Sequence, residues 1–355
     1  MRERIKRVRQ EMEERGIDGL LIDKGENRFY LTGFTGTAGR VLFTPEKNYF
    51  ITDFRYTEQA REQTDGYEIK EFNKDITQNI GEILKDDGVK ELGFETEVIS
   101  YSKYKEYNEH FYCELVPTKK IIERLRLKKE DKEIEEIRKA IDITDLAFSH
   151  IMDFIEPGVS EREVALELEF FMKKKGAEKN AFDFIVASGA RSSLPHGVAS
   201  DKRIEEGDFV TLDFGCFYNG YCSDMTRTIV VGEASDKQKE IYNLVLRAHY
   251  KVIDEIKPGM SYKEADNLAR TIISEAGYGD NFGHGLGHGI GIEVHEGPRL
   301  SYTAQDGKLE PGMIVTDEPG IYLSEWGGVR IEDDLLITEN GCKPLNNSPK
   351  KLIIL

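Results

Sequence analysis

Two stretches, IEEGDFVTLDFG (residues 204–215) and LEPGMIVTDEPG (residues 309–320), share a turn, an apolar strand and an acidic residue near the strand's end. Two further blocks precede them in the same order, PGVSEREV (157–164) and PGMSYKEA (258–265). The strand blocks lie 105 residues apart (204 to 309) and the earlier blocks 101 residues apart (157 to 258). Pro-Gly turns alone recur by chance, but two blocks in one order at nearly one offset indicate an internal repeat.

The earlier blocks also predict where helices begin. Each contains a Ser-x-x-Glu capping box, Ser160/Glu163 in the first and Ser261/Glu264 in the second. Each box follows one expected helix and opens the next. The sequence therefore predicts two copies of a helix–helix–strand unit related by a pseudo-twofold axis.

Length and charge density predict two domains. The chain has 355 residues, more than a single core usually holds. Residues 1–117 alternate short β-rich runs with helical stretches, which is typical of an α/β domain. The charge-dense segment 118–132 then leads into a helix with apolar residues at helical spacing. We expect an α/β (α+β) protein with domains at residues 1–125 and 126–355.

The overall composition excludes several classes of partner. The formal net charge of −17 argues against general affinity for nucleic acid or for an anionic membrane. The first apolar run is too short for a signal peptide or a membrane span. The four cysteines form no CxxC motif and no plausible disulfide framework. We expect a cytoplasmic protein.

The repeat places an acid at the same point of each half, Asp213 opposite Glu318. Asn219-Gly220 is a strong hairpin signal, and a two-residue turn there pairs Asp213 with Thr226. Asp224 then lies on the same face as Asp213, as a diagonal neighbour. Two carboxylates aimed at one point in a buried sheet repel each other unless a cation lies between them.

The second half offers a similar pair. MIVTDEPGIYLSEWGGVRIEDDLLI predicts a strand, a turn near Trp326, and a returning strand that carries Glu332 with Arg330 on the same face. Any one of these acids alone would more often be a solvated surface group. Their apolar neighbours argue against four exposed positions.

The stretch GHGLGHGIGIEVHEG (residues 283–297) holds three of the seven histidines. Glycine occupies every odd position from 283 to 291, so His284 and His288 can approach other strands closely. Four converging acids would bind hard divalent cations, and an imidazole among them would favour a transition metal. Spacing alone does not decide which histidine touches a metal.

Taken together, GHGLGHGIG, the Asp213/Asp224 hairpin, TDEPG and GGVRIEDD resemble the metal-binding set of the "pita-bread" metallopeptidases of family M24. That family includes aminopeptidase P, prolidase and methionine aminopeptidase. The N-terminal motifs YLTGFTGTAG and FITDFRY resemble the creatinase-like accessory domain of its Xaa-Pro-cleaving members. The resemblance covers nearly the whole chain and implies a creatinase-like domain followed by a pita-bread domain.

Carried over residue by residue, the resemblance implies two divalent metal ions, with manganese expected and cobalt or zinc as alternatives. Glu318 would also accept and pass on a proton, and His196 and His295 would stabilise the tetrahedral intermediate and contact substrate. The implied metal ligands are Asp213, Asp224, His288, Glu318 and Glu332.

Other residues receive supporting roles or none. The resemblance implies that Arg330 orients Glu332 or another ligand, and that Arg330 and Tyr322 contribute to substrate binding. His284 is expected to be structural. Cys222 could touch the site or act as a small buried filler. The remaining histidines, expected on the surface or on helices, are His110, His150 and His249.

The implied activity is hydrolysis of the Xaa-Pro bond in peptides with proline at the second position. That imide bond has no N–H and a constrained φ, so it needs a dedicated peptidase. Both an Xaa-Pro aminopeptidase and an Xaa-Pro dipeptidase (prolidase) fit, and sequence does not show whether the far end of the cleft is blocked. Alternatives on the same fold are a creatinase-like hydrolase without metal and a methionine aminopeptidase. The resemblance also implies a homodimer.

Overall fold

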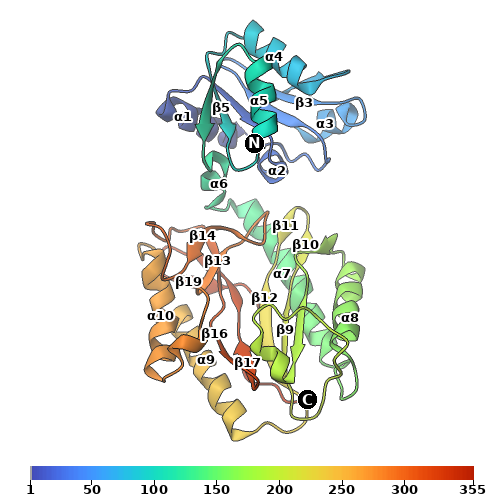
Figure 1. Ribbon diagram of the computed structural model, residues 1–355, viewed down its shortest axis with the longest axis vertical. Helices are drawn as coiled ribbons and strands as arrows, with labels where there is room; N and C mark the ends of the chain where they lie inside the picture. The colour runs from blue at the N-terminus through green and yellow to red at the C-terminus, as the bar shows by residue number, and fades with distance from the viewer. Residues whose placement is uncertain (1) are drawn as a thin grey trace. The chain divides into compact units, whose positions relative to one another are not determined.

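The computed structural model describes residues 2–355. The chain divides into two compact units, one ending at Arg126 and the other running from Leu127 to Leu355. Figure 1 shows that each unit is a set of strands flanked by helices. Every helix in the described chain is too short or too polar to cross a bilayer.

The first unit has a six-stranded mixed sheet in the order β4-β3-β2-β1-β5-β6. Its strands are β1 (Gly19–Ile22), β2 (Arg40–Phe43), β3 (Asn48–Thr52), β4 (Glu68–Glu71), β5 (Glu91–Glu95) and β6 (Glu114–Thr118). Its helices are α1 (Arg2–Arg15), α2 (Gly25–Thr32), α3 (Thr57–Gln63), α4 (Ile76–Asp86), α5 (Tyr101–His110) and α6 (Ile121–Arg126).

The apolar run Gly19–Ile22 forms β1, an inner strand of this sheet. β1 pairs antiparallel with β2 and parallel with β5, so it lies inside the sheet. All four residues of β1 are buried, as expected for a strand covered on both faces. Leu21 packs in one core with Leu42, Ile51 and Leu84.

The second unit repeats a pair of helices followed by strands. Its helices are α7 (Asp131–Ile151), α8 (Glu161–Lys174), α9 (Asp236–Glu255) and α10 (Tyr262–Glu275), with short 3₁₀ segments η1 (Gly189–Ser193) and η2 (Gly279–Asn281). Strands of the first half are β7 (Lys179–Asn180), β8 (Ile185–Ser188), β9 (Phe209–Phe214), β10 (Cys216–Tyr218), β11 (Tyr221–Cys222) and β12 (Met225–Val230). Strands of the second half are β13 (Gly287–Gly289), β14 (Glu296–Leu300), β15 (Ile314–Asp317), β16 (Gly320–Leu323), β17 (Gly327–Arg330), β18 (Asp333–Ile337) and β19 (Cys342–Pro344).

The predicted repeat is present down to individual hydrogen bonds. The amide of Gly158 donates to Ile204 O at 2.8 Å, and the amide of Gly259 donates to Leu309 O at 2.8 Å. These are equivalent positions of the two blocks. Both glycines have positive φ (97° and 87°), a conformation that other residues rarely adopt.

Both predicted capping boxes also form. Ser160 caps α8 and Ser261 caps α10, and in each helix the glutamate three residues later accepts from the cap amide. Reciprocal capping satisfies backbone donors that the first turn would leave free.

Each half has its own apolar core. Helices α7 and α8 pack with β8, β9 and β12, while α9 and α10 pack with β15, β17 and β18. In Figure 1 the two helix pairs lie on opposite sides of the strands within this unit. The halves meet where the amide of Glu332 donates to Thr226 O at 3.0 Å. Acidic residues from both halves are thereby brought together.

Candidate metal centre

The first pair of acids is placed by the predicted hairpin. Asn219 and Gly220 form its turn with positive φ values of 46° and 87°, as a type I′ turn requires. The observed register pairs Asp213 with Thr226, as expected. Asp224 precedes β12 by one residue and lies near the same point as Asp213, since both line one cavity.

The second pair differs from the expected hairpin. Glu318 directly follows β15, but Glu332 lies in a two-residue break between β17 and β18 rather than on one returning strand. β17 pairs with β16, whereas β18 pairs with β15. The break occurs where the Glu332 amide bonds to Thr226 of the other half. Thr226 also donates its hydroxyl to Glu332 Oε2 at 2.6 Å.

Close packing explains most of the glycine repeat. A Cβ on Gly287 would lie 2.1 Å from Thr316 O, and one on Gly289 would lie 1.8 Å from Gly297 O. Only glycine allows β13 to fit between β14 and β15. Gly283 differs, because a Cβ there would meet no described atom within 4 Å. His288 is held in this strand by its amide, which donates to Thr316 Oγ1 at 3.0 Å.

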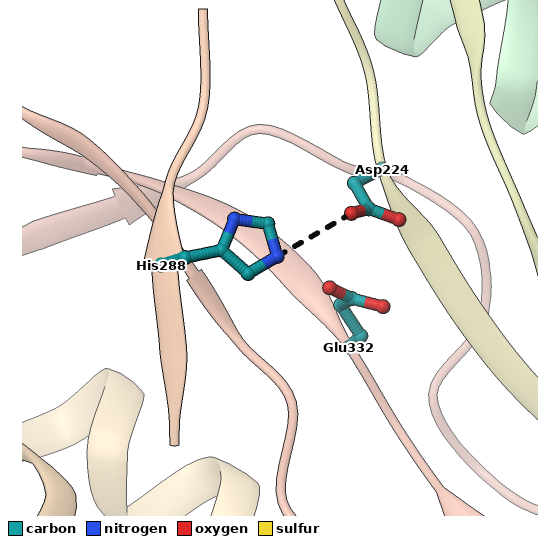
Figure 2. A group of neighbouring side chains, drawn as sticks. All are labelled: Asp224, His288 and Glu332. Atoms are coloured by element: carbon teal, nitrogen blue, oxygen red, sulfur yellow. Dashed lines mark ion pairs between the residues drawn. The ribbon is translucent and has the colours of Figure 1, made fainter. Parts of the chain in front are cut away.

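His288 points at the acids. Its Nε2 lies 3.7 Å from Asp224 Oδ2 and 3.6 Å from Glu318 Oε1. Figure 2 shows His288, Asp224 and Glu332 converging from three segments of the chain. One potential ligand atom from each of these three lies within 4.8 Å of the others, so together they could hold a metal ion.

The unpaired oxygens of the cluster fit a metal. Asp213 Oδ1 and Asp224 Oδ1 are buried and accept no hydrogen bond from any described residue. A buried carboxylate oxygen without a partner is costly. Carboxylate oxygens and one imidazole are a suitable donor set for divalent ions.

The electrostatics of the cluster lead to the same conclusion. Burial, followed by repulsion from Glu332 and Asp213, raises the pKa of Asp224 well above its usual value. Burial raises the pKa of Glu318 to about 8, and burial with repulsion from Glu318 raises the pKa of Glu332. Burial, assisted by His295, lowers the pKa of His288 to about 4. A divalent cation among these groups would favour the charged forms of the acids, and the neutral imidazole is free to coordinate it.

The cluster opens into a cavity of about 590 Å³. His196 and His295 line this cavity and are exposed. The half-buried His284 also lines it. The ring of His295 lies 4.4 Å from that of His288, centroid to centroid. Arg299, which the sequence interpretation overlooked, also lines the cavity.

Arg330 contacts Asp213 rather than Glu332. Its Nη2 donates to Asp213 Oδ2 at 2.6 Å, and its Nε donates to Thr226 Oγ1 at 3.0 Å. Its Nη1 donates to the Tyr322 hydroxyl at 2.7 Å and to Pro195 O at 3.3 Å. Tyr322 lies behind Arg330 and is not among the described residues lining the cavity.

Three remaining sequence expectations have different outcomes. Cys222 is buried, with its thiol 3.7 Å from Ile292 O, so it fills space in the hairpin. His110 and His150 lie on helices, as expected. His249 also lies on a helix, α9, but it is completely buried against Asp317 and Asp333. No sequence motif marks His249, because tertiary packing brings its two partners, which are distant in the sequence, next to it.

Comparisons with known proteins assign this architecture. Residues 135–339 match the model for metallopeptidase family M24, and residues 4–128 match the creatinase/prolidase N-terminal domain. The chain is 44% identical to an Xaa-Pro dipeptidase from Pyrococcus horikoshii, over 99% of each chain.

Solved structures agree. An Xaa-Pro dipeptidase from Bacillus anthracis superposes with a TM-score of 0.98 at 54% identity, covering 99% of each chain. An X-Pro aminopeptidase from Thermotoga maritima superposes with a TM-score of 0.90 at 41% identity, covering 96% of this chain and 98% of that one. The protein therefore belongs to metallopeptidase family M24, with a creatinase-type N-terminal domain followed by a pita-bread catalytic domain.

Proposed function

We propose that this protein is an Xaa-Pro dipeptidase that uses two divalent metal ions, with Mn²⁺ as the native metal. The observation that carries the proposal is the convergence of buried acids and His288 on one cavity, where Asp213 Oδ1 and Asp224 Oδ1 lack partners among the described residues. Relatives named Xaa-Pro dipeptidase, at 44% and 54% identity, support the substrate class. The ligands we assign are Asp213, Asp224, His288, Glu318 and Glu332.

Metal ions held by these residues would activate a water molecule and polarise the scissile carbonyl. The carboxylate of Glu318 would accept a proton from the attacking water and pass it to the leaving proline nitrogen. His196 and His295 would donate hydrogen bonds to the oxygen that becomes negative. Burial lowers the pKa of His295, so its neutral imidazole keeps one N–H for this purpose.

Arg330 lines the cavity and Tyr322 lies behind it, and both would support substrate binding. The guanidinium already donates to Asp213, Thr226, Pro195 and the Tyr322 hydroxyl. We therefore assign Arg330 to holding the first-half ligand Asp213 in place, with the Tyr322 hydroxyl as one further acceptor of its guanidinium.

Arg299 is the residue we assign to dipeptide selection. Its side chain is exposed to the cavity, and no hydrogen bond or ion pair joins it to another described residue. A dipeptide carries its carboxylate on the proline itself, close to the scissile bond, where a longer peptide has an amide. An arginine pairs well with a carboxylate, so Arg299 would favour the shorter substrate.

The test compares Gly-Pro, Ala-Pro and Arg-Pro-Pro with protein loaded with Mn²⁺. We expect hydrolysis of both dipeptides and little of Arg-Pro-Pro. Hydrolysis of Arg-Pro-Pro alone would instead identify an aminopeptidase P, and no hydrolysis by protein with two bound ions would reject the Xaa-Pro assignment. Arg299→Leu should raise KM for Ala-Pro about 10- to 100-fold, the range for a charged hydrogen bond, and Arg299→Lys should retain part of the affinity.

Two further parts of the proposal have direct measurements. Elemental analysis after reconstitution should give two ions per chain, and the affinity for Mn²⁺ should be compared with those for Co²⁺ and Zn²⁺. Light scattering should give the mass of a homodimer. A creatinase-like hydrolase would bind no such pair of ions.

A further inference from the structure

Two aspartates lie directly behind the candidate metal centre. Asp317 precedes Glu318, and Asp333 follows Glu332. Asp317 and Asp333 are cross-strand partners in the β15–β18 ladder. Both side chains are fully buried. Like charges that face each other across a ladder destabilise it, so this pair needs a compensating group.

Strand alternation places this pair on the face opposite the site. Thr316 and Glu318 are on the site face, where Thr316 Oγ1 lies 3.4 Å from Glu318 Oε1. Val315 points the other way and packs in the core with Val245 and Ala248 of α9. Asp317 shares the parity of Val315, so it faces α9. A displacement of Asp317 would therefore move Glu318 through the same backbone.

His249 of α9 lies between the two aspartates. Its Nδ1 is 2.9 Å from Asp317 Oδ2, and its Nε2 is 3.3 Å from Asp333 Oδ2. Asp333 has two more cations, with Arg227 Nη2 at 2.7 Å and Lys350 Nζ at 2.8 Å. For Asp317, His249 is the one cationic side chain within ion-pair distance in residues 2–355. Burial opposes charge on His249, yet the two carboxylates raise its pKa to about 9.

We propose that His249 is a positioning residue for the metal centre: its imidazolium holds Asp317 against Asp333 and thereby fixes the separation of Glu318 and Glu332 on the opposite face. The inference rests on the metal site proposed above. His249 thereby sets the geometry of that site from helix α9, without touching a metal ligand or the substrate. Groups that hold ligands in place typically change metal affinity 10- to 100-fold when removed.

The test measures metal binding in His249→Leu, with His150→Leu as the matched control. His150 is also a helix histidine paired with a carboxylate, Glu167 at 2.6 Å, but that carboxylate adjoins no candidate ligand. Titration of the chelator-treated proteins should give a Kd for Mn²⁺ that is 10- to 100-fold higher in His249→Leu and unchanged in His150→Leu. The visible absorption of the Co²⁺-loaded protein should also change only in His249→Leu, because it reports ligand geometry.

A double variant separates charge from packing. His249→Leu leaves Asp317 uncompensated, and adding Asp317→Asn removes the repulsion, so the double variant should recover metal affinity. Should His249→Leu not fold, His249→Gln gives the same comparison with a polar but uncharged side chain. An unchanged Kd and Co²⁺ spectrum in the His249 variants, or no recovery in the double variant, would overturn the inference. Failure of the unmodified protein to bind metal would refute the proposed function instead.

Discussion

Arg330 Nη2 lies 2.6 Å from Asp213 Oδ2, so an arginine on β17 of the second half holds an acid on β9 of the first. The same guanidinium holds Thr226, the hydrogen-bonding partner of Glu332. Asp213 keeps its other oxygen, Oδ1, without a partner among the described residues. One residue thus orients a carboxylate and leaves its second oxygen available to a metal.

Replacement of Arg330 by lysine should therefore weaken metal binding. A single ammonium group cannot reproduce the planar set of donors that reaches Asp213, Thr226 and Tyr322. We expect Kd for Mn²⁺ to rise about 10- to 100-fold, measured by titration. Tyr322→Phe is the control, since it removes one acceptor and leaves Asp213 held. An equal rise in Kd for Mn²⁺ in both variants would show that the contact between Arg330 and Asp213 does not determine metal affinity.

The assigned ligands should be individually required. Asp213→Asn and His288→Ala should each lose bound metal and abolish turnover of Ala-Pro, because the remaining donors no longer satisfy two ions. Elemental analysis and a hydrolysis assay measure both properties. Asp183→Asn is a matched control, since Asp183 lines the same cavity outside the cluster. Full metal content and activity in either ligand variant would remove that residue from the assignment.

Replacement of His295 should impair catalysis without loss of bound metal. His295→Ala should retain two ions per chain and lower kcat by about 10²- to 10³-fold, the usual effect of losing one donor to the developing oxyanion. The exposed His110 of the first unit provides the control, and His110→Ala should leave kcat unchanged. Unaltered kinetics in His295→Ala would leave that residue a structural role.

Local signals in the sequence were sufficient for much of the site. The Asn219-Gly220 turn fixes the register that aligns Asp213 with Thr226, because a two-residue turn leaves one pairing. The capping boxes at Ser160 and Ser261 likewise depend only on neighbouring residues. These features were predicted correctly because no distant contact decides them.

Other features depended on tertiary packing. The long side chain of Arg330 reaches across the halves to Asp213, and sequence could not choose among its acceptors. The break before Glu332 arises from its bond to Thr226, more than a hundred residues away in the chain. His249 gained its role because packing of α9 on the sheet brings it to Asp317. An amphipathic pattern shows that such a position is buried, but not what it meets.

Gly215 should test the close approach of the hairpin strands. A Cβ there would lie 1.9 Å from Ser223 O and 3.3 Å from the Cα of Asp224, so the strands carrying Asp213 and Asp224 would have to separate. Gly215→Ala should destabilise the protein by about 1–3 kcal/mol, as overpacking does, and weaken metal binding. Gly283→Ala is the control, since that site has open space. Urea denaturation with titration of Mn²⁺ measures both effects, and equal stability of the two variants would contradict the geometry.

His249 should also impose a pH dependence on stability. Asp317 and Asp333 raise its folded-state pKa to about 9 against the opposing effect of burial, while the unfolded value is near 6.5. Because the folded pKa is the higher one, the protonated form stabilises the fold. This contribution is complete below about pH 6.5 and is lost as the pH rises through about 9.

The measurement is the free energy of unfolding of chelator-treated protein between pH 6 and pH 10, for the unmodified chain and for His249→Leu. Both curves share every other group of the protein, so the difference between them isolates the contribution of the histidine. The unmodified protein should lose its advantage with rising pH. Parallel curves would mean that His249 is neutral in the folded protein, and Asp317 would then have no cation within ion-pair distance among the described residues.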